Sequence, residues 1–180
     1  MASILYNPGS SDRVMSPTEA AYVAGFVDGE GCLTIGRAKR SLKHNRAGFS
    51  YEALMNISNT NLRALYRIVD MCGNGKIQVQ DKRTNPDHAP LFRIVFSSNQ
   101  IRRVLPQLRQ FLFVKARQAD ILVEFLASKV GGRNVTLEHW QRWENLRAEV
   151  RTLNKRGSVN TSADTLQLRA DLRVHAQCVN

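Results

Sequence analysis

The sequence has little of what marks secreted, membrane-spanning or disulfide-linked proteins. Only three of its 180 residues are cysteine, and they lie far apart at positions 32, 72 and 178. An odd number at this spacing excludes a disulfide framework and a Cys-x-x-Cys metal site, and it favours a reducing compartment. No apolar run approaches the ~18 residues of a membrane span, and the first 16 residues lack the apolar centre of a secretory signal. We therefore expect a globular protein with no membrane partner.

Motifs for nucleotide cofactors and histidine metal sites are missing too. Residues 73–76, GNGK, lack the Gly-x-x-x-x-Gly-Lys-Ser/Thr frame of a P-loop. The four histidines have no metal-ligand spacing. We expect no nucleotide cofactor.

Acidic residues are scarce. The chain has 26 Lys and Arg against 15 Asp and Glu, a net charge of +11. Residues 1–30 nevertheless carry a net charge of −3, so the rest of the chain carries +14. A basic body with a small acidic cluster is typical of a nucleic-acid binder that also holds a divalent cation. A generic basic protein, such as a ribosomal or peripheral membrane protein, is the alternative.

The spacing of apolar residues predicts an α+β fold. Helical spacing, strand-like alternation and turn residues divide the chain into helices and strands. The predicted helices cover residues 19–28 (with Thr18 as N-cap), 99–111, 116–128, 137–153 and 163–172, and a further helix is capped by Asn59 or Thr60 and stops at residues 73–75. The predicted strands cover residues 32–38, 49–57, 76–80 and 91–96. This α-β-β-α-β-β-α order, followed by further helices, predicts a four-stranded antiparallel sheet with helices on one face. We expect a flexible leader over 1–17, a core over 18–128, and a helical extension of the same domain over 129–180.

The uncovered face of this sheet is predicted to be polar. Polar side chains on a twisted ribbon suit base readout in a major groove, although a merely solvated face gives the same pattern. The candidate DNA-contacting residues of the strands are Thr34, Ser50, Glu52, Asn56, Lys76, Gln78, Gln80 and Arg93. Those of the strand ends and loops are Arg40, Lys43, Arg46 and Lys82.

Small residues form a stripe along the first predicted helix. Ala21, Gly25 and Gly29 are spaced by four, so they lie on one face, flanked by Ala24 and Asp28. Such a stripe allows two helix backbones to approach closely. Packing of two copies about a two-fold axis would give a homodimer interface. Packing inside the chain's own core is the alternative.

Glu30 ends this helix. In a dimer of this kind the two Glu30 carboxylates would lie side by side, where they repel each other unless a cation shares them. Carboxylate oxygens suit Mg²⁺.

Residues 23–31, VAGFVDGEG, resemble the LAGLIDADG motif of the homing endonucleases. Ala24, Gly25, Asp28 and Gly31 are identical to the motif, and Glu30 replaces one acid by another. The resemblance, including the order of helices and strands, covers residues 18–128. Since the motif occurs once, the chain resembles the single-motif, intron-encoded branch that acts as a homodimer.

The resemblance implies a fold, an activity and a metal site. The fold is the LAGLIDADG homing-endonuclease fold, with a saddle-shaped sheet. The activity is hydrolytic cleavage of both strands of a long, pseudo-palindromic double-stranded DNA target, which supports intron homing. Mg²⁺, for which Mn²⁺ can substitute, would be held by Glu30 and the carbonyl of Gly29.

Three further residues resemble family positions near the reacting phosphate. Asn59 stands where a polar residue orders water; the family often has Gln there, and Asn reaches less far. Arg63 resembles a basic residue near the scissile phosphate. Lys115, within residues 111–119, resembles a lysine beside the active centre that positions or polarises the attacking water. For Arg63 and Lys115, phosphate or solvent contact without catalysis is the alternative.

Other functions stay open on the sequence alone. An RNA maturase or a non-cleaving DNA-binding relative would have the same fold, and a basic ribonucleoprotein component would need no catalysis. The expected location is an intracellular, DNA-containing compartment: a chloroplast, a mitochondrion or a bacterial cytoplasm.

Overall fold

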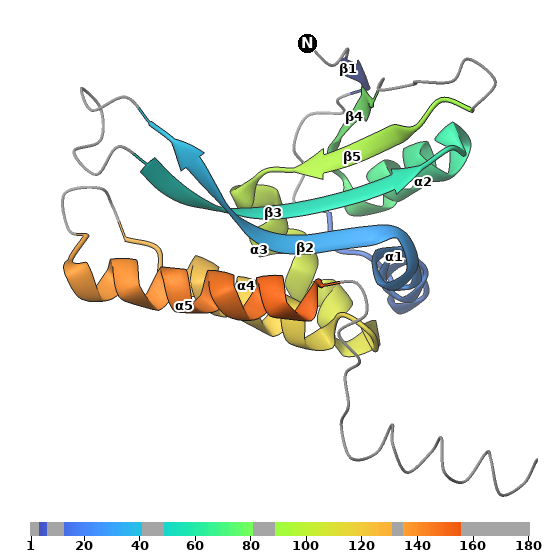
Figure 1. Cartoon of the computed structure of the whole chain (residues 1–180). Coiled ribbons are helices and arrows are strands. Elements are labelled where there is room, and N and C mark those ends of the chain that lie inside the picture. Colours follow the sequence, from blue (N-terminus) through green and yellow to red (C-terminus); the bar gives the residue numbers. More distant parts are fainter. Residues whose placement is uncertain (1–3, 7–12, 41–48, 81–88, 131–134, 156–180) are drawn as a thin grey trace, which may run out of the picture.

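A computed structural model describes residues 4–6, 13–40, 49–80, 89–130 and 135–155. In these ranges the helices pack on one face of an antiparallel sheet (Figure 1). The strands are β1 (Ile4–Tyr6), β2 (Gly31–Lys39), β3 (Phe49–Asn59), β4 (Lys76–Val79) and β5 (Phe92–Phe96). The helices are α1 (Pro17–Glu30), α2 (Leu62–Cys72), α3 (Ser98–Leu108), the 3₁₀ helix η1 (Arg109–Phe111), α4 (Ala116–Ala127) and α5 (Leu137–Leu153).

The sheet has the strand order β1-β4-β5-β3-β2, and all its pairs are antiparallel. The four predicted strands and their α+β arrangement are confirmed. The longest ladder joins β2 to β3, with Gly31 opposite Ile57 at one end and Lys39 opposite Phe49 at the other. The beginning of β2 and the end of β3 therefore lie together, next to the end of α1.

Alternating burial fixes which face of the sheet the helices cover. In β3, Tyr51, Ala53, Met55 and Ile57 are buried, and the residues between them are half-buried. The buried strand residues form one apolar cluster with buried residues of all five α-helices, such as Trp143 of α5. Because successive side chains of a strand point to opposite faces, the other set of side chains is left on the uncovered face.

The predicted leader contains a strand. Ile4 of β1 pairs with Gln78 of β4, which adds a fifth strand at the edge of the sheet. A segment of three residues carries no alternation that a sequence pattern can detect, and its pairing with β4 makes it a strand.

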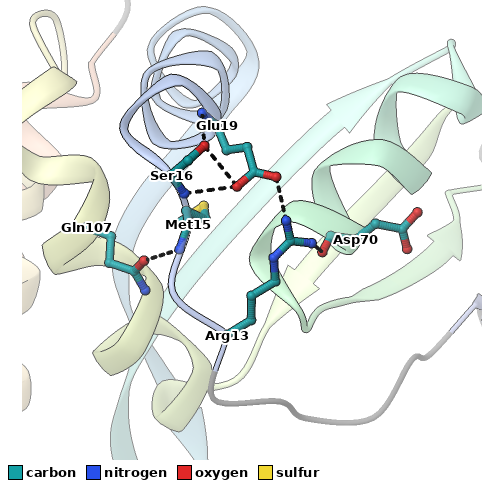
Figure 2. A network of polar contacts seen from close by, with 6 residues as sticks. All are labelled: Arg13, Met15, Ser16, Glu19, Asp70 and Gln107. Carbon is teal, nitrogen blue, oxygen red and sulfur yellow. Dashed lines mark hydrogen bonds and ion pairs between the residues drawn. The ribbon is translucent and has the colours of Figure 1, made fainter.

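Hydrogen bonds also fix the chain just before α1 (Figure 2). Arg13 donates to the carbonyl oxygen of Asp70 at 2.7 Å and pairs with Glu19 at 2.5 Å. The backbone N–H of Met15 donates to Oε1 of Gln107 at 2.8 Å. These contacts tie the start of α1 to α2 and α3, so the prediction of a flexible leader is wrong for residues 13–16.

Helix α1 begins two residues earlier than predicted, because Ser16 is its N-cap and Thr18 is not. The Ser16 hydroxyl accepts from the N–H of Glu19 at 3.3 Å, and the Glu19 carboxylate accepts from the N–H of Ser16 at 2.9 Å. Pro17 fits the first helical position because no helical partner is lost there.

The C-terminal helices largely follow the prediction. Helix α3 contains Pro106 and ends at Leu108, and η1 continues to residue 111. Helix α5 has the predicted bounds, and the Asn154 side chain after it donates to the carbonyl of Leu33 in β2 at 2.8 Å. The helix predicted over 163–172 lies outside the described residues. None of the helices in the described ranges has the length and apolar character needed to cross a membrane.

Candidate active site

Gly31 joins α1 directly to β2 without a loop. Its N–H donates to the carbonyl of Val27, which closes the last turn of the helix. A Cβ at position 31 would lie 2.5 Å from that carbonyl oxygen and 2.8 Å from Val27 Cα, so only glycine fits. This tight junction places Glu30 at the corner where helix and sheet meet.

Glu30 is exposed, and in the described part of the chain its carboxylate has no hydrogen-bond or ion-pair partner. Within the same ranges, no group of three His, Cys, Asp or Glu side chains could hold a metal ion. One protomer therefore offers a single acidic side chain here, beside the backbone carbonyls at the end of α1. Carboxylate and carbonyl oxygens are the ligands that Mg²⁺ prefers, so the residues at this position fit the ion. A complete octahedral set of six ligands needs further oxygen atoms from outside the protomer.

Lys115 lies at the same helix end. Its ammonium group donates to the carbonyl oxygen of Asp28. This carbonyl belongs to the last turn of α1, where carbonyls have no partner within the helix and the helix dipole favours a positive charge. The structure thus brings Lys115 to within two residues of Glu30 along α1.

The Asp28 carboxylate binds the chain around Lys115. It accepts from the backbone N–H groups of Phe113 at 2.8 Å, Val114 at 3.1 Å and Lys115 at 2.8 Å. Partial burial acts to raise the pKa of Asp28, but these donors and the Lys115 charge outweigh it and hold the pKa below its ordinary value. Asp28 is therefore an ionised acceptor inside its own protomer.

The predicted interface residues divide into two groups. Ala21, Gly25 and Gly29 lie exposed on one side of α1. Ala24 is fully buried in the protomer's own core, because it points toward the helices and strands on the opposite side. The prediction of an interface role is wrong for the Ala24 side chain, and for Asp28 the carboxylate is used within the protomer.

Asn59 and Arg63 lie near the same end of the sheet. Asn59 ends β3, two residues beyond Ile57, which pairs with Gly31. Its side-chain oxygen accepts from the backbone N–H of Asn61 at 2.8 Å, and Asn61 is the N-cap of α2 in place of the predicted Asn59 or Thr60. Arg63 follows, exposed in the first turn of α2. The structure thus brings Lys115 to the end of α1 that bears Glu30, and it places Asn59 at the end of the neighbouring strand, where Asn59 also shapes the entry to α2. For Arg63 it shows only the exposed position on α2.

The predicted DNA-contacting residues of the strands share the uncovered face of the sheet. Pairing places Thr34 beside Leu54, Asn56 beside Val95, and Gln78 beside Arg93 in neighbouring strands. By alternation, this face holds Thr34, Ser50, Glu52, Asn56, Lys76, Gln78 and Arg93, with Gln80 directly after β4. Lys43, Arg46 and Lys82 lie outside the described residues.

Three of these polar side chains bind one another at the far end of the β2–β3 ribbon. Arg40 forms an ion pair with Glu52 and donates to the hydroxyl of Ser50 at 2.9 Å. Arg93 in the middle of the face donates to Ser58 at 3.2 Å. The Glu52 charge is therefore balanced within the protein.

Sequence reasoning missed two features of the site. Exposed Cys32 pairs with Asn56, so it lies on the uncovered face two residues from Glu30. The buried Leu33 and Ile35 that follow it carried that signal. The contact between Asp28 and residues 113–115 spans more than 80 residues of sequence, and no local pattern indicates it.

The family profile described as LAGLIDADG endonuclease matches residues 23–124, more than half of the chain. The chain belongs to the LAGLIDADG endonuclease family. No curated protein sequence gives a match.

Solved structures of homing endonucleases share the fold of this LAGLIDADG protein. I-CvuI, bound to its target in the presence of calcium, is 19% identical with a TM-score of 0.62, over 84% of this chain and 91% of its own. The archaeal intron-encoded I-Vdi141I, complexed with DNA, is 19% identical with a TM-score of 0.66, over 82% and 91%. The meganuclease I-SmaMI, bound to uncleavable DNA, is 15% identical with a TM-score of 0.61, over 76% of this chain and 45% of its own.

Proposed function

We propose that two copies of this chain form a site-specific DNA endonuclease that hydrolyses both strands of a long, pseudo-palindromic target with the help of a divalent metal ion. The observation that carries the proposal is the partnerless Glu30 carboxylate, within the described ranges, at the end of a helix whose exposed side is a strip of glycine and alanine. Both features belong to the motif for which the family is named.

The glycines of α1 support a homodimer. A Cβ added at Gly25 or Gly29 would meet no neighbouring atom of the described protomer within 4 Å, and neither glycine has a positive φ. The protomer itself therefore has no use for glycine here, although glycine inside a helix costs roughly 0.5–1 kcal/mol relative to alanine. Close approach of a second α1 about a two-fold axis supplies the missing reason. The chain also covers most of I-CvuI but under half of I-SmaMI, as one of two equivalent units would.

The dimer would complete the metal site. Two symmetry-related Glu30 carboxylates and Gly29 carbonyls near the axis, together with phosphate and water oxygens, match the oxygen ligands that Mg²⁺ requires. A bound ion would lower the pKa of an attacking water and neutralise charge on the phosphate. Mn²⁺, with similar ligand preferences, is expected to substitute.

The surrounding side chains would position the reactants. Water attacks phosphorus and gives up a proton to solvent, the bond to the leaving oxygen breaks, and that oxygen takes up a proton, so one water molecule is added in all. The Lys115 ammonium group supplies positive charge beside the phosphate. In the described residues the Asn59 amide nitrogen has no acceptor, so it is free to orient the water, and Arg63 is exposed for a phosphate contact.

The uncovered sheet face supports double-stranded DNA as the substrate. Its polar side chains follow neighbouring strands, and a two-stranded ribbon fits the major groove. In a dimer, two such faces would lie side by side along one duplex, which suits a long target with two half-sites.

A library of plasmids carrying intron insertion sites tests the proposal. Incubated with Mg²⁺, the protein should linearise a small set of plasmids; with Ca²⁺, it should bind the same sites. Binding without linearisation under either metal would identify a non-cleaving DNA-binding relative. Preference for intron RNA over every duplex would identify a maturase instead.

A further inference from the structure

The segment before α4 is held by one carboxylate from a distant helix. Phe113 and Val114 are 92% and 60% exposed, so their side chains provide almost no packing within the described part of the protomer. What holds their backbone is Asp28, which accepts the N–H groups of both residues and of Lys115.

Helix α4 has no cap of its own. Lys115 occupies its N-cap position and makes no side-chain capping bond there. The unpaired N–H groups and the positive dipole at a helix N-terminus favour an anion. The Asp28 carboxylate places a negative charge at this end, bound to the N–H groups of residues 113–115 that lead into the helix.

The contact is reciprocal, because the Lys115 ammonium group donates to the carbonyl of the same Asp28. The Asp28 carbonyl thus binds the Lys115 ammonium group, and the Asp28 carboxylate binds the Lys115 backbone N–H. This double link joins the C-terminal end of α1, which bears Glu30, to the N-terminal end of α4.

We propose that Asp28 is a positioning residue, whose carboxylate holds residues 113–115 so that the Lys115 ammonium group stays at the end of α1 beside Glu30. This inference rests on the proposed nuclease function and assigns Asp28 a part in it. Losing the link would move Lys115 while leaving Glu30 and the DNA-facing sheet in place. A displacement of about 1 Å can lower a reaction rate about 100-fold.

The main variants are Asp28→Asn, Lys115→Met and the double variant. Asparagine turns an NH₂ group toward backbone N–H donors and so weakens the link at nearly unchanged size. Asp120→Asn is the matched control. Asp120 of α4 binds Arg109 of η1 at 2.5 and 2.8 Å, so it joins the two elements that flank residues 112–115 without touching Asp28.

The measurements are single-turnover cleavage and equilibrium binding on one duplex selected from the plasmid library. Asp28→Asn should cleave about 100-fold more slowly, with the DNA dissociation constant unchanged within about threefold. Added to Lys115→Met, it should cause no further loss of rate, because both changes remove the same ammonium group from its place. Asp120→Asn should cleave within about threefold of the wild type, and amide exchange at residues 113–115 should rise only in Asp28→Asn.

The inference would be overturned if folded Asp28→Asn cleaved at the wild-type rate, or if its DNA affinity fell as much as its cleavage rate. It would also be overturned if the double variant lost the product of the two single-variant rate reductions. If Asp28→Asn does not fold, Asp28→Glu keeps the charge with both acceptors one methylene further out. Asp28→Glu should cleave at a rate between that of the wild type and the rate expected for Asp28→Asn. In the Lys115→Met background, Asp28→Glu should cause no further loss of cleavage rate. A wild-type protein that cuts no duplex would instead refute the proposed function, and uncoupled losses in an active enzyme would refute only the role of Asp28.

Discussion

Neighbouring acids of α1 have opposite environments. Asp28 is ionised and bound by three backbone N–H groups, whereas Glu30, two residues on, has no partner in the described ranges. An exposed carboxylate without a partner keeps its oxygens available to a cation. The motif thus uses one acid to build the protomer and leaves the other available for chemistry.

Replacing Glu30 by Gln should separate binding from cleavage. The shape is kept, but each protomer loses one negative charge, and a neutral amide is a poor ligand for Mg²⁺. Less repulsion with phosphate should keep or slightly tighten DNA binding. Cleavage should fall about 10³-fold or more, because each ~1.4 kcal/mol of lost charge stabilisation costs a factor of ten.

Gel shift and cleavage on one selected duplex in Mg²⁺ measure both effects. Glu30→Asp should retain part of the activity, and Glu138→Gln, the same charge change on an exposed residue at the start of α5, should retain all of it. Near-normal cutting by Glu30→Gln would place the metal site elsewhere and leave the motif as a helix interface.

The ion pair between Asp120 and Arg109 predicts a pH-dependent contribution to stability. Hydrogen bonding from Arg109, together with its charge, holds the pKa of Asp120 below its ordinary value. Folding therefore favours the ionised form, so this stability is complete above the unfolded pKa of about 3.9. It is lost as the pH falls through the lower folded value. Both side chains are about 40% exposed, so screening limits the contribution to under about 1 kcal/mol.

Urea unfolding of Asp120→Asn and of the wild type at several pH values measures the contribution of this ion pair to the free energy of unfolding. The stability difference should be constant at neutral pH and should shrink as the pH drops below about 4. A difference that grows on acidification would contradict the assigned pKa direction.

Among the helices and strands, those with a periodic pattern of apolar residues were predicted from the sequence. Elements that depend on a few isolated contacts were not. Strand β3 was predictable because apolar residues alternate from Phe49 to Ile57, and β2 because Leu33 and Ile35 continue the same pattern over a shorter stretch. Strand β1 was not, since three residues show no period and its partner β4 lies some 70 residues away. The start of α1 was misjudged because Ser16-Pro17 suits both a loop and a helix N-terminus.

Sequence patterns likewise predicted some residues of the candidate site and missed others. The motif indicated Glu30, and a resemblance indicated Lys115; the structure places both at one helix end. The role of Asp28 depends on amides more than 80 residues away. For Ala24, helical spacing predicted which residues lie next to it on α1, but it did not predict that this side of the helix faces the core.

Helix α1 should control the oligomeric state. Replacing Gly25 by Leu adds a large side chain where the protomer has open space, so the protomer should fold normally. The same side chain would hold two packed α1 helices apart. We expect Gly25→Leu to sediment as a monomer at concentrations where the wild type is a dimer, with an unchanged circular dichroism spectrum.

Val123→Leu enlarges a partly exposed apolar residue on α4, away from α1, and should leave the dimer intact. A wild type that remains monomeric over the whole concentration range would contradict the homodimer.

For the whole molecule, the middle of the uncovered face differs from its far end, where Arg40 is paired with Glu52, and from the helical layer. Arginines over the helical layer, such as Arg117 and Arg142, bind Glu149 and Glu124. Arg93, in the middle of the uncovered face, binds only the neutral Ser58 among the described residues. Positive charge without an acidic partner therefore lies where the proposed duplex would run.

The salt dependence of DNA binding tests this distribution and the dimer together. Each phosphate contact contributes ~0.9 to the slope of log K against log salt. Replacing Arg93 by Gln in a dimer removes two contacts, so the slope should fall in magnitude by ~1.8, whereas a bound monomer would give ~0.9. Arg142→Gln makes the same change of net charge on the helical layer and should leave the slope unchanged. Equal slopes for the wild type and Arg93→Gln on the selected duplex would remove the centre of this sheet face from the DNA interface, because counterion release reports contact rather than overall charge.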